Sequence, residues 1–224
     1  MKKQTWITAH SDAEGMPQNS MEFLQYALQT AADVIEVDVH RDPHTGALVL
    51  THDWEEGGAY VSLEAAFIMV SQHPSMRVNC DLKEAGLEPQ VIGLAKKLGI
   101  TERLIFSGTV DPEQVPLANR EQIHWNIEEQ IPDLYQRCQH DPAYVSQAAE
   151  EMCKRCIPLG IRTINVYHAL ACDSFLDVLE RSSIGASVWV VDEPEQIRRF
   201  LSRGVCSITT CKLSQALSIR QQMR

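Results

Sequence analysis

Short apolar runs alternate along the whole chain with stretches in which apolar residues recur at helical spacing. A short continuous apolar run is typical of a buried strand, whereas apolar positions three and four residues apart are typical of a helix covering a core. The runs predict strands at residues 6–10, 34–39, 77–83, 103–108, 122–127, 163–168, 186–191 and 207–211. The helical periodicity predicts helices near residues 20–32, 62–72, 87–98, 111–118, 141–157, 174–183, 194–203 and 213–222.

Residues that commonly begin or end helices agree with several of these boundaries. Gly99 and Gly204 follow two of the predicted helices, where glycine often takes the left-handed conformation that ends a helix. Glu193-Pro194 precedes another, and proline is favoured in the first turn of a helix. The chain is therefore divided into elements by local signals as well as by periodicity.

Eight alternations of strand and helix predict a parallel sheet with helices outside it. In 224 residues they suit a compact (β/α)8 TIM barrel that spans residues 1–224 as one domain. Its active site would lie at the C-terminal ends of the strands. An open doubly wound sheet is the alternative, although no glycine-rich phosphate loop follows the first strand. A further strand at 48–51 should pair back on the second strand through a turn at 42–46.

Composition narrows the classes of partner. The formal net charge is -10 and Lys and Arg form no cluster, which disfavours a nucleic-acid partner. An anionic substrate would need a local cation, such as a metal ion or a single Lys. The seven cysteines form no disulfide framework, and the N-terminus has no signal-peptide pattern, so we expect a cytoplasmic protein. The longest apolar runs are too short for stable membrane insertion.

Acidic residues interrupt the second apolar run at Glu36 and Asp38. Side chains two apart on a strand point the same way, so two carboxylates should lie side by side. A divalent cation between them would remove their repulsion, and oxygen ligands suit Mg²⁺ or Ca²⁺. His10 and His52 close the neighbouring apolar runs and add the side chain best suited to proton transfer at neutral pH. A metal ion with two proton carriers points to hydrolysis or transfer at phosphorus.

Polar residues also alternate along the third strand, as Asn79, Asp81 and Lys83. In a barrel these side chains would gather with those of the first two strands at one end. The prediction requires that Asp81 and Glu36 lie close together.

Taken in order, these segments resemble the glycerophosphodiester phosphodiesterase family, one of the phospholipase-C-like barrel phosphodiesterases. Each motif of that family has a counterpart here. The early motifs are His-Arg-Gly, Pro-Glu-Asn-Thr, Glu-x-Asp-Val, His-Asp and Asn-x-Glu-x-Lys. The late ones are Val-Trp-Thr-Val-Asn and Gly-Val-Asp-Gly-Ile-x-Thr-Asp. In the same order, the counterparts in this chain are His10-Ser11-Asp12, Pro17-Gln18-Asn19-Ser20, Glu36-Val37-Asp38-Val39, His52-Asp53, Asn79-Cys80-Asp81-Leu82-Lys83, Val188-Trp189-Val190-Val191-Asp192 and the segment from Gly204 to Cys211.

The resemblance implies a metal-dependent phosphodiesterase and a role for each matching residue. His10 and His52 would be the general acid and base, and Lys83 would neutralise an oxygen of a small-molecule phosphodiester. One Mg²⁺ or Ca²⁺ would be held by a carboxylate set, namely Glu36, Asp38 and Asp81. The alternative for these three carboxylates is a buried hydrogen-bonded network without a metal ion. The alternative for Lys83 is a structural ion pair with Glu36 or Asp38. Trp189 would form a wall for the alcohol, or else belong to the core.

The sequence departs from the family pattern at several positions. Ser11 replaces an arginine that would contact phosphate, and could donate only a single hydrogen bond there. Gln18 replaces a glutamate, Asp81 a longer glutamate, and Cys211 an aspartate. The loop after His52 lacks the family's inserted subdomain. These departures keep two further interpretations open: a lipid-headgroup phosphodiesterase resembling a sphingomyelinase D or phospholipase D, and a non-catalytic metal- or phosphate-binding barrel.

Overall fold

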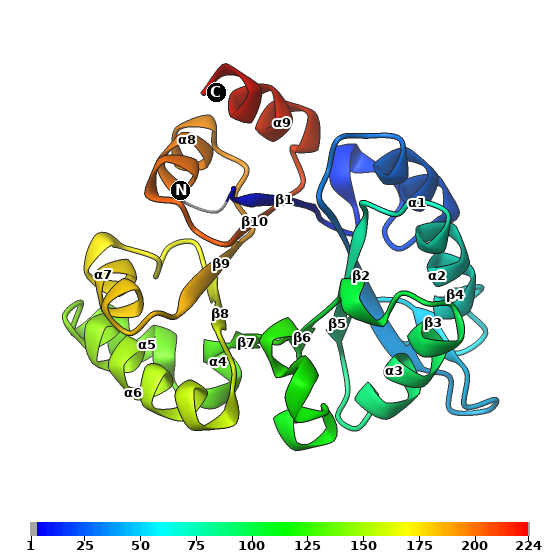
Figure 1. The fold of residues 1–224 in the computed structure, drawn as a ribbon, viewed down its shortest axis with the longest axis horizontal. Coiled ribbons are helices and arrows are strands. Elements are labelled where there is room, and N and C mark those ends of the chain that lie inside the picture. The colour runs from blue at the N-terminus through cyan, green and yellow to red at the C-terminus, as the bar shows by residue number, and fades with distance from the viewer. Residues whose placement is uncertain (1–3, 224) are drawn as a thin grey trace.

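The computed structural model describes residues 4–223 and has a ring of eight parallel strands at its centre (Figure 1). The strands of the ring are β1 (Trp6–Ala9), β2 (Val34–Arg41), β5 (Arg77–Leu82), β6 (Leu104–Gly108), β7 (His124–Asn126), β8 (Thr163–Tyr167), β9 (Gly185–Trp189) and β10 (Ser207–Thr210). Each lies within two residues of a strand that the apolar runs predict.

The ring closes where the last strand meets the first. β10 pairs in parallel with β1, from Trp6 opposite Ser207 to Ala9 opposite Thr210. The weakest seam lies between β6 and β7, which are joined through a single bridge from Phe106 to Ile123. The barrel predicted from the alternation of strands and helices is thus confirmed, and the open doubly wound sheet is excluded.

Helices surround the ring and cover its outer face (Figure 1). They are α1 (Met21–Leu28), α2 (Leu63–Ser71), α3 (Glu88–Lys97), α4 (Ile127–Gln130), α5 (Leu134–His140), α6 (Tyr144–Leu159), α7 (Asp173–Arg181), α8 (Pro194–Arg203) and α9 (Leu213–Gln222). The expected signals are present, since Pro194 opens α8 and Gly204 ends it with a φ of 75°. Fully buried phenylalanines such as Phe23, Phe67 and Phe200 fill the layer between helices and barrel.

The helix predicted at 111–118 is wrong. Two short 3-10 segments, Pro112–Gln114 and Leu117–Gln122, occupy that region. Pro116 separates them, because proline lacks a backbone N–H and holds the preceding residue extended; Val115 has a ψ of 126°. The periodicity also missed the short helices α4 and α5, which are only one or two turns long.

A small antiparallel extension leaves the barrel beside β2. β3 (Leu48–Leu50) pairs back on β2, with Leu50 opposite Val39, as the sequence predicts. β4 (Val61–Ser62) pairs with β3. β3 returns along the far end of β2 as far as Asp38, whose carbonyl accepts from the Thr51 backbone N–H at 3.1 Å. The next residue, His52, therefore lies at the C-terminal end of the barrel, beside the cavity.

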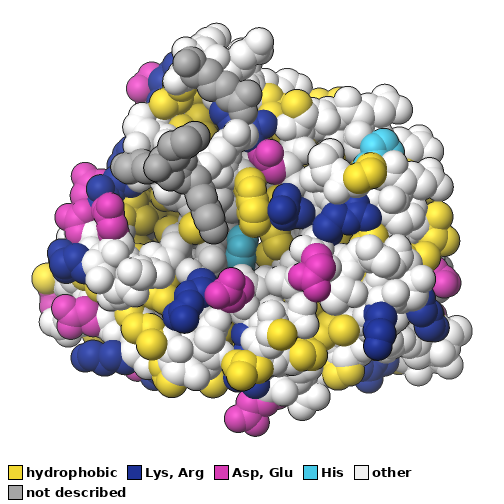
Figure 2. All heavy atoms as spheres, in the orientation of Figure 1, with side chains coloured by type: hydrophobic (Ala, Val, Ile, Leu, Met, Phe, Trp, Pro, Cys, Tyr) yellow, Lys and Arg dark blue, Asp and Glu magenta, His cyan; other side chains and the backbone are white. Residues whose placement is uncertain are grey.

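Two properties of the surface bear on partners. On the face shown in Figure 2, Lys and Arg side chains are interspersed with Asp and Glu side chains and do not form one broad basic patch. Among residues 4–223, no helix combines the length and the apolarity needed to cross a membrane.

Candidate active site

A cavity of about 420 Å³ opens at the C-terminal ends of the barrel strands. It is lined by residues from five different parts of the chain for which the sequence predicts a chemical role. They are His10, Glu36, Asp38, His52, Asp81, Lys83 and Trp189. Ser11 is the exception among the proposed residues, since it is fully buried and does not line the cavity.

Strand pairing sets the positions of the carboxylates. In the parallel register of β2 and β5, Glu36 lies opposite Asn79 and Asp38 lies opposite Asp81. One oxygen from each of Glu36, Asp38 and Asp81 lies within 4.8 Å of the others. The requirement that Asp81 and Glu36 lie close together is therefore met.

Lys83 neutralises part of this cluster. Its Nζ lies 2.7 Å from Asp38 Oδ1 and 2.5 Å from Asp81 Oδ2. Burial opposes the charge on Lys83, but the two carboxylates outweigh burial and raise the pKa of the ammonium. The structural ion pair weighed for this lysine is therefore present, with Asp81 and Asp38 as its partners, and the side chain still lines the cavity.

The loop after β1 holds Asp38 in place. Ser11 Oγ donates to Asp38 Oδ2 at 3.0 Å, Asn19 Nδ2 donates to the same oxygen at 2.8 Å, and the Asp38 backbone N–H donates to Asn19 Oδ1. Gln18 Nε2 donates to both Ser11 Oγ and Asp38 Oδ2. Burial disfavours the Asp38 carboxylate, yet Lys83 and these hydrogen bonds bring its pKa below the usual value.

These contacts give Ser11 a role beside the phosphate contact that the sequence predicts for it. Its hydroxyl is directed at Asp38 instead of at the cavity, and its backbone N–H donates to Glu36 Oε2 at 2.9 Å. Ser11 and Gln18 both depart from the family pattern, and they contact each other. The two changes together form a neutral hydrogen-bonded support for a buried carboxylate.

Asp81 is supported from the next strand. Ser107 Oγ donates to Asp81 Oδ1 at 2.6 Å, and Asn79 Nδ2 donates to Ser107 Oγ. Gly108 follows with a φ of +76°, and a Cβ there would lie 2.4 Å from the Leu82 carbonyl oxygen. Glycine is therefore required for β6 to approach β5 this closely.

Glu36 carries the least compensated charge of the three acids. Burial and the neighbouring Asp38 raise its pKa to about 8, against the opposing effects of His10 and Lys83. The raised pKa means that Glu36 holds a proton near neutral pH, and a divalent cation bound to the three acids would displace that proton.

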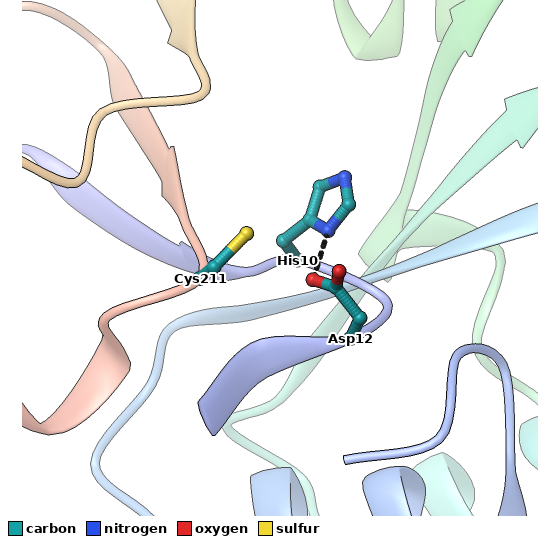
Figure 3. A group of neighbouring side chains, drawn as sticks. All are labelled: His10, Asp12 and Cys211. Atoms are coloured by element: carbon teal, nitrogen blue, oxygen red, sulfur yellow. Dashed lines mark hydrogen bonds and ion pairs between the residues drawn. The ribbon is translucent and has the colours of Figure 1, made fainter. Parts of the chain in front are cut away.

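His10 follows β1 and is held on one side of its ring. Nδ1 lies 2.6 Å from Asp12 Oδ1, and Figure 3 shows the other ring nitrogen directed away from both Asp12 and Cys211. Burial disfavours the charged ring, but hydrogen bonds with Cys211 and Asp12 and the charge of Glu36 raise its pKa to about 10. His52 differs, since its side chain is 52% exposed and its Nδ1 lies 3.2 Å from Asp53 Oδ2.

Further polar residues that line the cavity come from the opposite side of the barrel. Asn126 Oδ1 accepts from the Gly108 backbone N–H and from Asn165 Nδ2, while Asn126 Nδ2 donates to Glu128 Oε1. Asn126 ends β7 and Glu128 follows it in α4, so both lie at the C-terminal end of the barrel. Asn165 and Ser107 lie inside apolar strands, where the pattern gives no sign of a polar role.

Three buried polar atoms of cavity residues have no partner within the described chain: Asn79 Oδ1, Glu128 Oε2 and Trp189 Nε1. Buried polar atoms are normally hydrogen-bonded, and a water molecule or a polar ligand would complete these three. The Trp189 ring also packs against Tyr167, with centroids 5.5 Å apart.

Comparisons with known proteins place the fold. No protein-family model matches the chain, and no curated protein sequence matches it. Among solved structures, a glycerophosphodiester phosphodiesterase from Parabacteroides distasonis is 17% identical with a TM-score of 0.75, covering 100% of this chain and 99% of that one. One from Thermotoga maritima is 17% identical with a TM-score of 0.67, covering 99% of both. An Oleispira antarctica phosphodiesterase, solved with the product sn-glycerol-3-phosphate, is 14% identical with a TM-score of 0.66, covering 97% of both.

Proposed function

Because this chain has the fold of the glycerophosphodiester phosphodiesterases, we propose that it hydrolyses a glycerophosphodiester to an alcohol and a phosphomonoester, or to a cyclic phosphate intermediate. One observation carries the proposal: three carboxylates, a lysine and two histidines from four separate segments line one cavity at the C-terminal end of the barrel. That end is where barrels of this type place their chemistry.

Glu36, Asp38 and Asp81 would together hold one divalent cation, Mg²⁺ or Ca²⁺. Their oxygens lie within 4.8 Å of one another, and all three are hard oxygen ligands. Asn79 lines the same cavity, and its Oδ1 has no partner among the described residues. The bound ion would act as a Lewis acid on a phosphoryl oxygen.

The two histidines would move the protons. His10 has its Nδ1 hydrogen-bonded to Asp12, which fixes the ring and leaves Nε2 to exchange a proton with substrate. His52, half exposed on the loop after β3, reaches the same cavity from the other side of β2. One ring would take the proton of an attacking substrate hydroxyl or water while the other protonates the leaving alcohol.

Lys83 and Trp189 would position the substrate. Lys83 is tied to two carboxylates, and a divalent cation on those carboxylates would free its ammonium for a phosphate oxygen. Trp189 would offer its indole N–H and ring face to the alcohol part. Free thiols are present at Cys80, Cys138, Cys153, Cys156, Cys172 and Cys211, which supports a reducing compartment such as the cytoplasm.

The test is turnover by the purified chain on a panel of glycerophosphodiesters and choline lysophospholipids, with Mg²⁺ or Ca²⁺ supplied. We expect release of alcohol from the water-soluble diesters, lost in His10→Ala and in His52→Ala and kept in His44→Ala, whose ring is exposed and outside the cavity. Preference for lysophospholipids would favour the lipid-headgroup interpretation. Metal binding without turnover on any diester would favour the non-catalytic barrel.

A further inference from the structure

A second group of potential metal ligands lies beside the carboxylate cluster and differs from it in chemistry. His10, Asp12 and Cys211 offer one nitrogen, one oxygen and one sulfur, all within 4.8 Å of one another. Figure 3 shows the three side chains converging from the loop after β1 and from the end of β10. Asp12 and Cys211 are also positions where the sequence departs from the family's pattern, and both departures meet at the same histidine.

The backbone holds these three residues in a fixed relation. The His10 backbone N–H donates to the Thr210 carbonyl, and the Glu14 backbone N–H donates to the Cys211 carbonyl. The Cys211 backbone N–H donates to Asp192 Oδ1 at 2.8 Å. Two adjacent strand ends are thus tied to each other on both sides of the cluster, so that the side chains meet without a large rearrangement.

We propose that His10, Asp12 and Cys211 form an inhibitory site for a zinc-type transition metal, separate from the carboxylate site for Mg²⁺ or Ca²⁺. Zinc takes sulfur, nitrogen and oxygen ligands at about 2.0–2.3 Å in a tetrahedron, which places ligand atoms roughly 3–4 Å apart. The three ligand atoms already lie within 4.8 Å of one another, with His10 Nδ1 and Asp12 Oδ1 2.6 Å apart. Water would fill the fourth position.

Two properties of the cluster favour a metal-binding site over a site built around a reactive cysteine. The side chains of His10 and Asp12 are 24% and 44% exposed, so an ion can reach them from solvent. Burial raises the pKa of the Cys211 thiol, against the opposing effect of His10, which makes the free thiol a weak nucleophile. A bound metal ion deprotonates a coordinating thiol outright.

Zinc would inhibit the protein because it would bind the Nδ1 atom of His10. Binding forms metal–sulfur, metal–nitrogen and metal–oxygen bonds and releases to solvent the thiol proton of Cys211 and the proton shared by His10 Nδ1 and Asp12. No electrons are transferred. With Nδ1 coordinated, Nε2 keeps its proton, and the ring can no longer alternate between its protonated and neutral forms during turnover. This inhibitory consequence rests on the proposed phosphodiesterase function, whereas the metal binding does not.

The binding is tested with Co²⁺, a spectroscopic substitute for Zn²⁺, added to metal-free protein. We expect one equivalent to produce a sulfur-to-cobalt charge-transfer band that Zn²⁺ then removes. The band should vanish in Cys211→Ser, and Asp12→Asn should weaken binding by more than ~10-fold, since even outer-shell changes cost that much. It should persist in Asp81→Asn, and in Cys172→Ser, whose thiol lies beside Ser174 outside the cluster.

Two results would overturn the site whatever the activity of the protein: no charge-transfer band in the wild type, or a band that survives in Cys211→Ser. Turnover then tests inhibition separately. Excess Mg²⁺ fills the carboxylate site in this assay. Zn²⁺ should then slow hydrolysis by the wild type, whereas Cys211→Ser should hydrolyse substrate at nearly the same rate with and without Zn²⁺. Equal inhibition of both proteins would show that zinc acts only at the carboxylates.

Discussion

Asp38 on β2 and Asp81 on β5 are direct partners in the parallel register of the two strands, and both carboxylates accept from the same ammonium, Lys83 Nζ. The register brings like charges side by side, which is unfavourable without a cation between them. Lys83 supplies one positive charge to a cluster that also contains Glu36. The behaviour of this cluster when its cation is changed is therefore the first thing to measure.

Lys83→Met should destabilise the metal-free protein. Removing one partner from a buried ion pair leaves uncompensated charge, and typically costs ~3–5 kcal/mol of unfolding free energy. Mg²⁺ or Ca²⁺ should recover part of the loss, because ligand binding to the folded state adds stability by mass action. Chemical denaturation with and without the ion measures both effects. Lys96→Met, on the exposed face of α3, is the matched control and should change little. A metal-free stability equal to the wild type would contradict the pairing.

Ser11→Ala should weaken the support of Asp38. The variant loses a buried hydrogen bond to a charged acceptor, and such bonds are worth ~1.5–3 kcal/mol. We expect unfolding free energy to fall by about that amount, with a lowered affinity for the divalent cation. Ser218→Ala, at an exposed position of α9, provides the comparison. If Ser11 instead contacts substrate, the variant would raise the KM for substrate and leave stability and cation affinity unchanged.

The sequence predicted the barrel, and many of the residues that line the cavity, because both depend on periodic or local features. Apolar runs gave the eight strands, and alternation within them put Glu36 with Asp38 and Asp81 with Lys83 on common faces. Contacts between segments that are distant in the sequence could not be predicted in this way. The direction of Ser11 Oγ depends on how the loop after β1 folds over β2, and the meeting of Cys211 with Asp12 depends on barrel closure. Pro116 interrupted a helix that the apolar spacing alone predicts.

Trp189→Phe should separate a hydrogen-bonding role of the indole from a packing role. Phenylalanine keeps an aromatic wall but removes the unpartnered N–H. Losing one hydrogen bond of ~0.5–1.5 kcal/mol should raise KM by between about twofold and tenfold, with little change in kcat. Trp125→Phe is a close control, because its Nε1 is also buried and unpartnered but the residue does not line the cavity. Equal effects of the two variants on KM would assign Trp189 to packing.

His124 predicts a pH dependence of stability unrelated to the cavity. The ring is buried at the start of β7, and burial lowers its pKa from 6.5 to about 4. Between these two values the unfolded chain binds a proton that the folded chain does not, so stability falls as the pH is lowered. The loss is on the order of 3 kcal/mol between pH 7 and 4. Unfolding curves of the wild type and His124→Asn should differ in slope against pH. If the stability of both proteins changes with pH in the same way, His124 does not cause the effect. His44→Asn is the control: His44 is exposed on a turn, so this variant should follow the wild type.

The central claim is that the acidic cluster and the two histidines act together on a phosphodiester. It is tested most directly by the initial rate of glycerophosphodiester hydrolysis after metal removal and stepwise return of Mg²⁺ or Ca²⁺, in the wild type and in Asp81→Asn. We predict no rate without the ion, a saturable recovery in the wild type, and a recovery in Asp81→Asn that needs at least ~10-fold more ion. Metal-independent hydrolysis, or identical ion dependence of the two proteins, would contradict the account.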